Sequence, residues 1–136
     1  MKTIKVLSAI SFLLVAIGFC MPWLEFYGTV SGIDAVRTGI IYIFNGHGFS
    51  MLDMLLLFAV MPLFSALATW HIVFANKYGS SLIYILLVNL TLIFATWFIF
   101  GFTSLRGIYL GFYIMVIGII LLNCLSISGY LKSRKL

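Results

Sequence analysis

Four long apolar runs constrain the fold of this chain more than any other feature of its sequence. They cover about residues 4–21, 50–74, 81–100 and 107–131. Each run has close to the roughly 20 residues that a helix needs to cross a hydrocarbon core of about 30 Å. Unpaired backbone groups are costly in hydrocarbon, so such runs must form helices or a closed barrel. The runs lack the alternating polarity of barrel strands. We therefore predict an all-α membrane protein, a four-transmembrane-helix bundle.

The composition agrees with this fold class. Hydrophobic residues make up 64% of the chain and charged residues only 8%, whereas about a quarter of the residues in soluble domains are charged. The 136 residues leave room for a single domain, residues 1–136, and no separate soluble module. The net charge of +5 comes from basic residues that are scattered or lie in a short tail. A nucleic-acid site would need a basic stripe on a folded surface, so we expect membrane lipids, not nucleic acid, as partners.

The distribution of these basic residues predicts the orientation. Basic residues are enriched in the cytoplasmic loops of membrane proteins. Two of them fall on the predicted outer side, Arg37 and Arg106. Six fall on the other side: Lys2, Lys5, Lys77, Lys132, Arg134 and Lys135. Both termini are therefore expected in the cytoplasm.

The outer segment, residues 23–49, is too apolar for a free loop and too interrupted to span a membrane. Ser31 is followed three residues later by Asp34, the spacing of a capping box at a helix start. Gly39 follows where a helix of about two turns would end. We predict a short capped helix over residues 31–39 that lies against the outer membrane surface or over the mouth of the bundle.

Other residues mark the ends of the spans. Ser50 and Asp53 repeat the cap spacing at the start of the second span. Trp23 and Trp70 are expected at the two interfaces, because indole rings favour the headgroup level. Pro62, near the middle of the second span, should kink that helix because it lacks a backbone donor.

Polar residues inside the spans form a predicted intramembrane layer. At 1.5 Å per residue, each lies about 10 to 13 Å from the cytoplasmic end of its span. The layer comprises Ser11, Ser65, Asn89 and Asn123. An amide in hydrocarbon needs a partner, which a neighbouring helix can supply at matched depth. The layer is interpreted either as interhelical contacts or as a polar cavity for an ion or a substrate head group.

Glycines in the fourth span provide a helix-contact face. Gly107, Gly111 and Gly118 lie on roughly one side of the helix. Small residues at this spacing let two helices approach closely. The face is expected to serve packing inside the bundle or self-association between copies.

The sequence contains no motif that indicates catalysis. It has no CxxC, no HExxH and no phosphate-binding loop, and no Ser/His/Asp set is apparent. Glu25 with His47 would be a weak metal or proton site, and His71 has no buried carboxylate as a relay partner. We expect no catalytic residue, no metal and no cofactor, and so not an enzyme.

The plan of four spans, inner termini and a long first outer segment from Trp23 resembles the claudin-type tetraspan plan. The claudin first loop carries paired cysteines, and residues 23–49 contain none. Pro22-Trp23 followed by Ser31-Gly32-Ile33 is similar to a pattern in small bacterial membrane proteins. The resemblance implies a bacterial inner (plasma) membrane protein. The expected function is non-catalytic, through protein or lipid contacts, as an accessory subunit of other membrane proteins or as a homo-oligomer. The alternative is a small oligomeric channel or transporter around the Asn89 and Asn123 layer.

Overall fold

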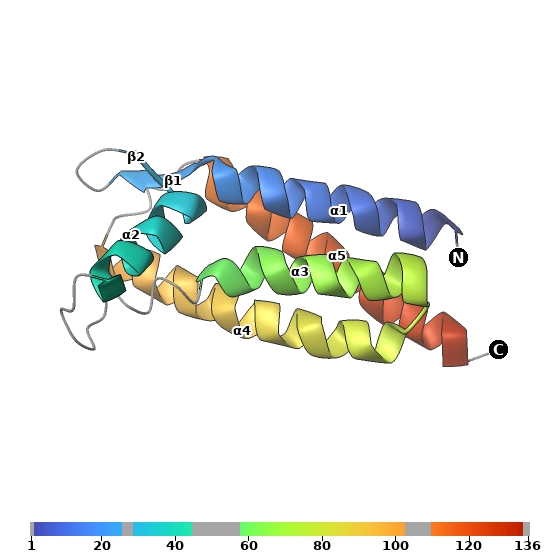
Figure 1. Cartoon of the computed structure of the whole chain (residues 1–136). Coiled ribbons are helices and arrows are strands. Elements are labelled where there is room, and N and C mark those ends of the chain that lie inside the picture. The colour runs from blue at the N-terminus through green and yellow to red at the C-terminus, as the bar shows by residue number, and fades with distance from the viewer. Residues whose placement is uncertain (1, 26–28, 45–57, 103–109, 135–136) are drawn as a thin grey trace.

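The computed structural model describes residues 2–25, 29–44, 58–102 and 110–134. Helices run side by side along one direction, and the two chain ends lie at the same end of the bundle (Figure 1). The long elements are α1 (Lys2–Cys20), α3 (Val60–Trp70) with its π-helical extension η2 (His71–Ala75), α4 (Tyr78–Phe102) and α5 (Leu110–Arg134).

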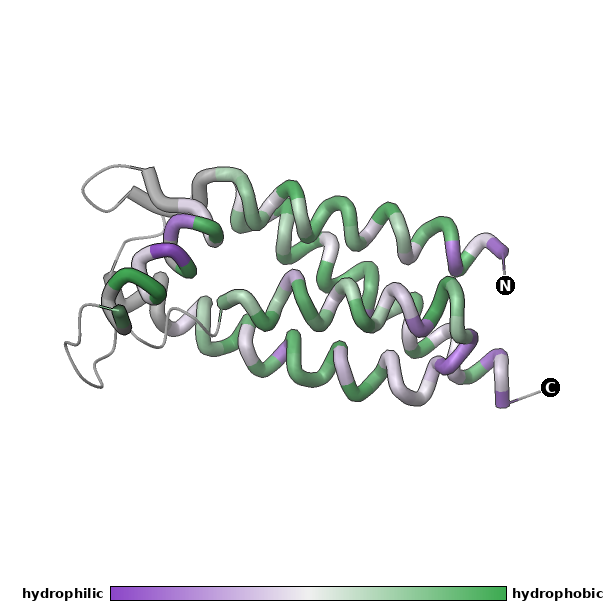
Figure 2. Tube along the Cα trace, viewed as in Figure 1, coloured by the Kyte–Doolittle hydropathy of each residue, from purple (hydrophilic) through white to green (hydrophobic). Residues whose placement is uncertain are grey.

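Three of these helices are long and apolar enough to cross a membrane: Lys2–Cys20, Tyr78–Trp97 within α4, and Leu110–Arg134. The fourth long element, α3 with η2, is apolar but shorter over its described residues, Val60–Ala75. Apolar residues extend along the helices, and hydrophilic ones gather toward the ends of the molecule (Figure 2). This arrangement is compatible with the predicted helical membrane bundle.

Two predicted boundaries need correction. Helix α4 begins at Tyr78 instead of residue 81, because the Tyr78 ring packs against Gly129 of α5 and so belongs to the folded core. Pro62 is the third residue of α3, which begins at Val60. In the first turn of a helix a missing backbone donor costs little, because that donor has no partner within the helix. The kink expected at Pro62 is therefore not required. Residues 50–57 lie outside the described part.

A tight connection joins α3 to α4. The π-helical turn η2 ends at Asn76, whose φ of 53° is left-handed. The backbone N–H groups of Asn76 and Lys77 both donate to the carbonyl of His71, the latter at 2.9 Å. Only two residues therefore separate the two helices, and α3 with η2 and α4 form an antiparallel hairpin.

The opposite end carries the elements of the outer segment. Strands β1 (Pro22–Glu25) and β2 (Thr29–Ser31) pair antiparallel and lead directly into α2 (Gly32–Phe44). The hairpin was not anticipated. The prediction that this helix ends at Gly39 is wrong, because Gly39 is buried inside α2 and the apolar residues after it continue the helix.

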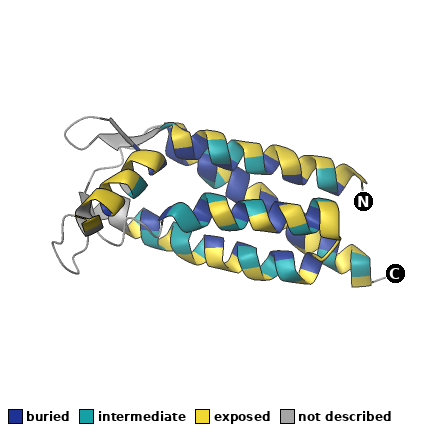
Figure 3. Ribbon diagram, viewed as in Figure 1, coloured by how far each residue is buried: buried dark blue, intermediate teal, exposed yellow. Residues whose placement is uncertain are grey.

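Buried hydrophobic residues form two clusters, one toward each end of the bundle. Buried and exposed positions alternate along the ribbons of the long helices (Figure 3). The cluster on the α2 side consists of Val15, Phe19, Phe58, Met61, Val88, Ala95, Phe112, Met115 and Ile119. The cluster near the chain ends consists of Ile4, Ala68, Ile72, Tyr78, Ile85 and Leu122.

Candidate functional site

Asn89 of α4 and Asn123 of α5 contact each other directly. The Asn89 Nδ2 donates to the Asn123 Oδ1 at 2.7 Å, and the Asn123 Nδ2 donates to the Asn89 Oδ1 at 2.9 Å. The Asn123 Nδ2 also donates to the carbonyl of Ile119 at 2.8 Å. Each amide therefore uses both a donor and an acceptor on the other helix. Such reciprocal bonding fixes the register of α4 against α5, because a shift by one residue would break both bonds.

The two serines of the predicted polar layer do not join this amide pair. The Ser11 Oγ donates to the carbonyl of Leu7 in its own helix at 2.8 Å. Ser65 is fully buried, and its hydroxyl has no hydrogen-bond partner. The four residues therefore do not form one connected network.

Several further buried hydroxyls, which the sequence did not single out, also have no partner in the described structure. They belong to Ser8, Thr69, Tyr78 and Ser126. They come from all four long helices and lie in the half of the bundle near the chain ends. Buried polar atoms are normally hydrogen-bonded to protein or to ordered water. This half of the interior therefore offers unused donors and acceptors, whereas the buried cluster on the α2 side is apolar.

Helices α1 and α5 approach each other closely at their glycines. A Cβ atom added at Gly18 would lie 2.5 Å from the Met115 backbone N and 2.6 Å from the Gly111 carbonyl O. One added at Gly118 would lie 2.8 Å from the Ser11 carbonyl O. The structure therefore places Gly111 and Gly118 inside the bundle, against the first helix, and not on an outer face. Gly107 lies outside the described residues.

Sequence reasoning missed Gly18, although a signal for it exists. Ser8, Ser11 and Gly18 lie three and seven residues apart, so α1 carries its own stripe of small residues. Two such stripes on different helices favour a close crossing. Comparing the glycines of the fourth span with this stripe would have predicted the pairing of the first and last helices.

The predicted cap at Ser31 forms the start of α2. The Asp34 Oδ2 accepts from the Ser31 backbone N and from the Ser31 Oγ, each at 3.1 Å. The Asp34 backbone N donates to the Ser31 Oγ at 3.2 Å. These reciprocal bonds satisfy backbone donors at the helix N-terminus and position α2 directly after β2.

Replacing Ser31 by alanine should destabilise α2 by about 1 kcal/mol, because it removes the side chain that caps the Asp34 backbone N. Hydrogen exchange of the α2 amides should become faster. Thr38→Val serves as the control, since the Thr38 hydroxyl donates only to the Asp34 carbonyl of its own helix. Equal exchange in wild type and Ser31→Ala would show that the cap does not stabilise α2.

The other predicted residues are not part of one site. Trp23 lies in β1, and Trp70, which is 57% exposed, ends α3. The His71 ring lies 5.1 Å from the Tyr84 ring. Among the described residues, no three histidines, cysteines or acids are grouped so that they could hold a metal ion. Ser50, Asp53 and His47 lie outside the described part.

The fold and the site together describe a small helical bundle with apolar outer faces, a paired amide contact and a glycine-mediated crossing. No protein-family model matches the chain, and no significant match is found among curated proteins or among solved structures.

Proposed function

We propose that the chain is a non-catalytic integral membrane protein with four spans that acts through contacts with lipids or with other membrane proteins. In this proposal it is an accessory subunit or a homo-oligomer of a bacterial inner membrane. The apolar outer faces of the helices support the membrane location. Leu13, Leu63, Ile93 and Ile117 are each more than half exposed, and they come from four different helices.

The proposal that the protein does not conduct ions or solutes rests on the filled interior on the α2 side. Val15, Met61, Val88 and Met115 are all fully buried in one cluster. Large apolar side chains from every long helix therefore occupy the space through which a polar solute would have to pass. Among the described residues, this packing supports a single copy that does not conduct polar solutes.

Flux through liposomes that contain the pure protein tests this proposal. Ion and small-solute flux should equal that of empty liposomes, and cross-linking in native membranes should yield a partner or an oligomer. Flux that depends on the protein would overturn the non-conducting proposal. The result would favour the alternative, a small oligomeric channel or transporter.

The unpaired hydroxyls are the specific observation that favours this alternative. Ser8, Ser65 and Ser126 are fully buried without a hydrogen-bond partner. If they line a hydrated passage in an oligomer, Ser65→Ala should reduce flux while the fold stays intact. If the interior is dry, the same change should be neutral or stabilising, because it removes an unsatisfied buried group.

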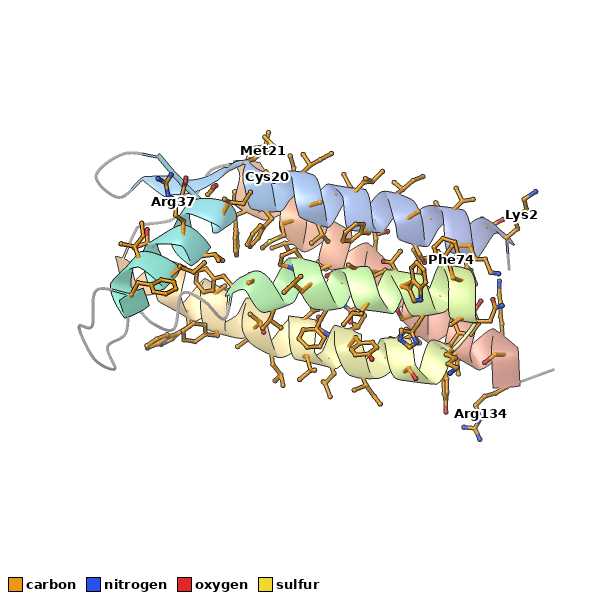
Figure 4. The ribbon with its side chains drawn as sticks, viewed as in Figure 1. Lys2, Cys20, Met21, Arg37, Phe74 and Arg134 are labelled. Atoms are coloured by element: carbon orange, nitrogen blue, oxygen red, sulfur yellow. The ribbon has the colours of Figure 1, made fainter. Side chains whose placement is uncertain are left out.

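Orientation gives a separate prediction. Lys2 and Arg134 lie at the end with the chain termini, whereas Arg37 lies at the α2 end (Figure 4). By the positive-inside rule, the end with the termini faces the cytoplasm. A reporter fused after Leu136 should be active only inside the cell. A cysteine at Lys77 should resist labelling from outside, in a background without Cys20 and Cys124, which are free and exposed. External labelling at this position would reverse the proposed topology.

A further inference from the structure

An apolar groove opens between α1, α2 and the start of α3. Its volume is about 450 Å³. All of its described lining residues except one are apolar: Phe19, Ile33, Val36, Ile40, Ile41, Ala59, Pro62 and Leu63, with Arg37 as the exception. Leu63 is 63% exposed, so the groove is continuous with the outer surface of the bundle. The described lining contains no acidic residue.

Arg37 has no ion-pair partner among the described residues. The nearest acid in sequence on the same helix is Asp34, and its Oδ2 already accepts two hydrogen bonds from Ser31. Arg37 is exposed. Its guanidinium therefore remains available to an anion from outside the protein. A planar guanidinium binds phosphate with two parallel hydrogen bonds.

A second apolar groove adjoins the first along α3. It has a volume of about 470 Å³ and is lined by Leu63, Phe64, Ala66, Leu67 and Trp70. The two grooves share Leu63. From Ala59 to Trp70 the helix rises roughly 16 Å at about 1.5 Å per residue. The two adjoining grooves thus offer an elongated apolar surface along α3, with one cation, Arg37, in the lining of the first.

From this juxtaposition we propose that the groove binds one acyl chain of an anionic glycerophospholipid, with the lipid phosphate at Arg37. The elongated apolar shape fits a hydrocarbon chain. The single uncompensated cation fits a head group with a net negative charge better than a zwitterionic one. This inference rests on the proposed membrane location, and it specifies which lipid the protein contacts.

Native mass spectrometry of the full chain in detergent tests the inference with two lipids of identical acyl chains, phosphatidylglycerol and phosphatidylcholine. Wild type should retain phosphatidylglycerol preferentially. Arg37→Gln should lower this preference roughly fivefold, the effect of one basic residue on binding to anionic lipid. Arg134→Gln is the matched control, because it removes an exposed arginine at the opposite end. Equal loss in both variants would mean attraction by net charge and would overturn the site.

The acyl-chain part has its own test. Leu63→Trp should fill the point that the two grooves share and reduce retention of both lipids. The side chain at this position is largely exposed, so the substitution should not disturb the core. Leu90→Trp is the control, since Leu90 is 56% exposed on α4 and lines neither groove. Unchanged retention in folded Leu63→Trp would contradict an acyl chain in this groove. If inorganic phosphate alone gave the same differences in binding between wild type and variants, the ligand of the groove would not be a lipid.

The failure of this inference can be distinguished from failure of the proposed function. Resistance of the protein to alkaline extraction from membranes tests the membrane location alone. A protein that stays in the membrane fraction but binds both lipids equally would contradict only the lipid inference. If the protein dimerises equally with and without lipid, and Leu63→Trp abolishes the dimer, the groove binds a second copy of the chain. That result would overturn the inference.

Discussion

Gly18→Leu should prevent the native bundle from forming. The first side-chain atom at this position would lie 2.5 Å from the Met115 backbone N and 2.6 Å from the Gly111 carbonyl O. Backbone atoms of α5 cannot move aside as a flexible side chain could, so the two helices must separate. Overpacking of this kind costs roughly 3 kcal/mol or more, which exceeds the gain of about 0.8 kcal/mol from replacing a helical glycine. Thermal unfolding in detergent and protease resistance measure the effect.

Gly79→Ala provides the matched control. An added Cβ at Gly79 meets only the Tyr130 ring, at 4.0 Å, so this variant should unfold at the wild-type temperature or slightly above it. Gly118→Leu should behave like Gly18→Leu, because a Cβ added at Gly118 would lie 2.8 Å from the Ser11 carbonyl O in the same crossing. A folded monomeric Gly18→Leu protein that has only lost an oligomer would instead assign these glycines to a contact between copies.

The Asn89 and Asn123 pair should show a coupling energy of roughly 0.6 to 2 kcal/mol in a double-mutant cycle with leucine. The single changes should differ. In Asn123→Leu the Asn89 amide loses both of its bonds, whereas in Asn89→Leu the Asn123 amide keeps its bond to the Ile119 carbonyl. We therefore expect Asn123→Leu to cost about 1 to 3 kcal/mol, and Asn89→Leu to cost less. The double variant should recover part of the loss.

Unfolding in bicelles gives the four free energies of this cycle. Thr91→Val is the control for a polar deletion in the same helix, because the Thr91 hydroxyl donates only to the Leu87 carbonyl. Zero coupling between Asn89 and Asn123 would contradict their direct contact. If the single variants keep their stability but change ligand binding or transport, the amides line a cavity and the alternative function gains support.

The helical fold class could be predicted from the sequence because its cause is local. Long apolar runs exclude other structures in hydrocarbon, and three of the four predicted spans correspond to helices of sufficient length. The Ser31 and Asp34 cap is also local, since its groups lie three residues apart. The equal depth of Asn89 and Asn123 followed from counting residues along the two predicted spans that carry them.

Features that depend on tertiary packing could not be predicted in the same way. Gly39 was expected to end a helix, yet its environment is buried and α2 continues to Phe44. The pairing of Gly18 with Gly111 joins segments far apart in the sequence, so neither span alone indicates it. The hairpin of β1 and β2 depends on backbone pairing across three residues that lie between the strands.

The crossing of α1 and α5 has a consequence for how the protein is made. α1 packs along α5 more extensively than any other pair of described elements does, so the main partner of α1 is synthesised only after α2, α3 and α4. About 114 residues separate Cys20 from Arg134, which takes roughly 6 to 23 s at about 5 to 20 residues per second. During that interval α1 presents Ser8, Ser11 and Gly18 without their partner helix. The hairpin of α3 and α4, by contrast, can close as soon as both helices have emerged from the ribosome.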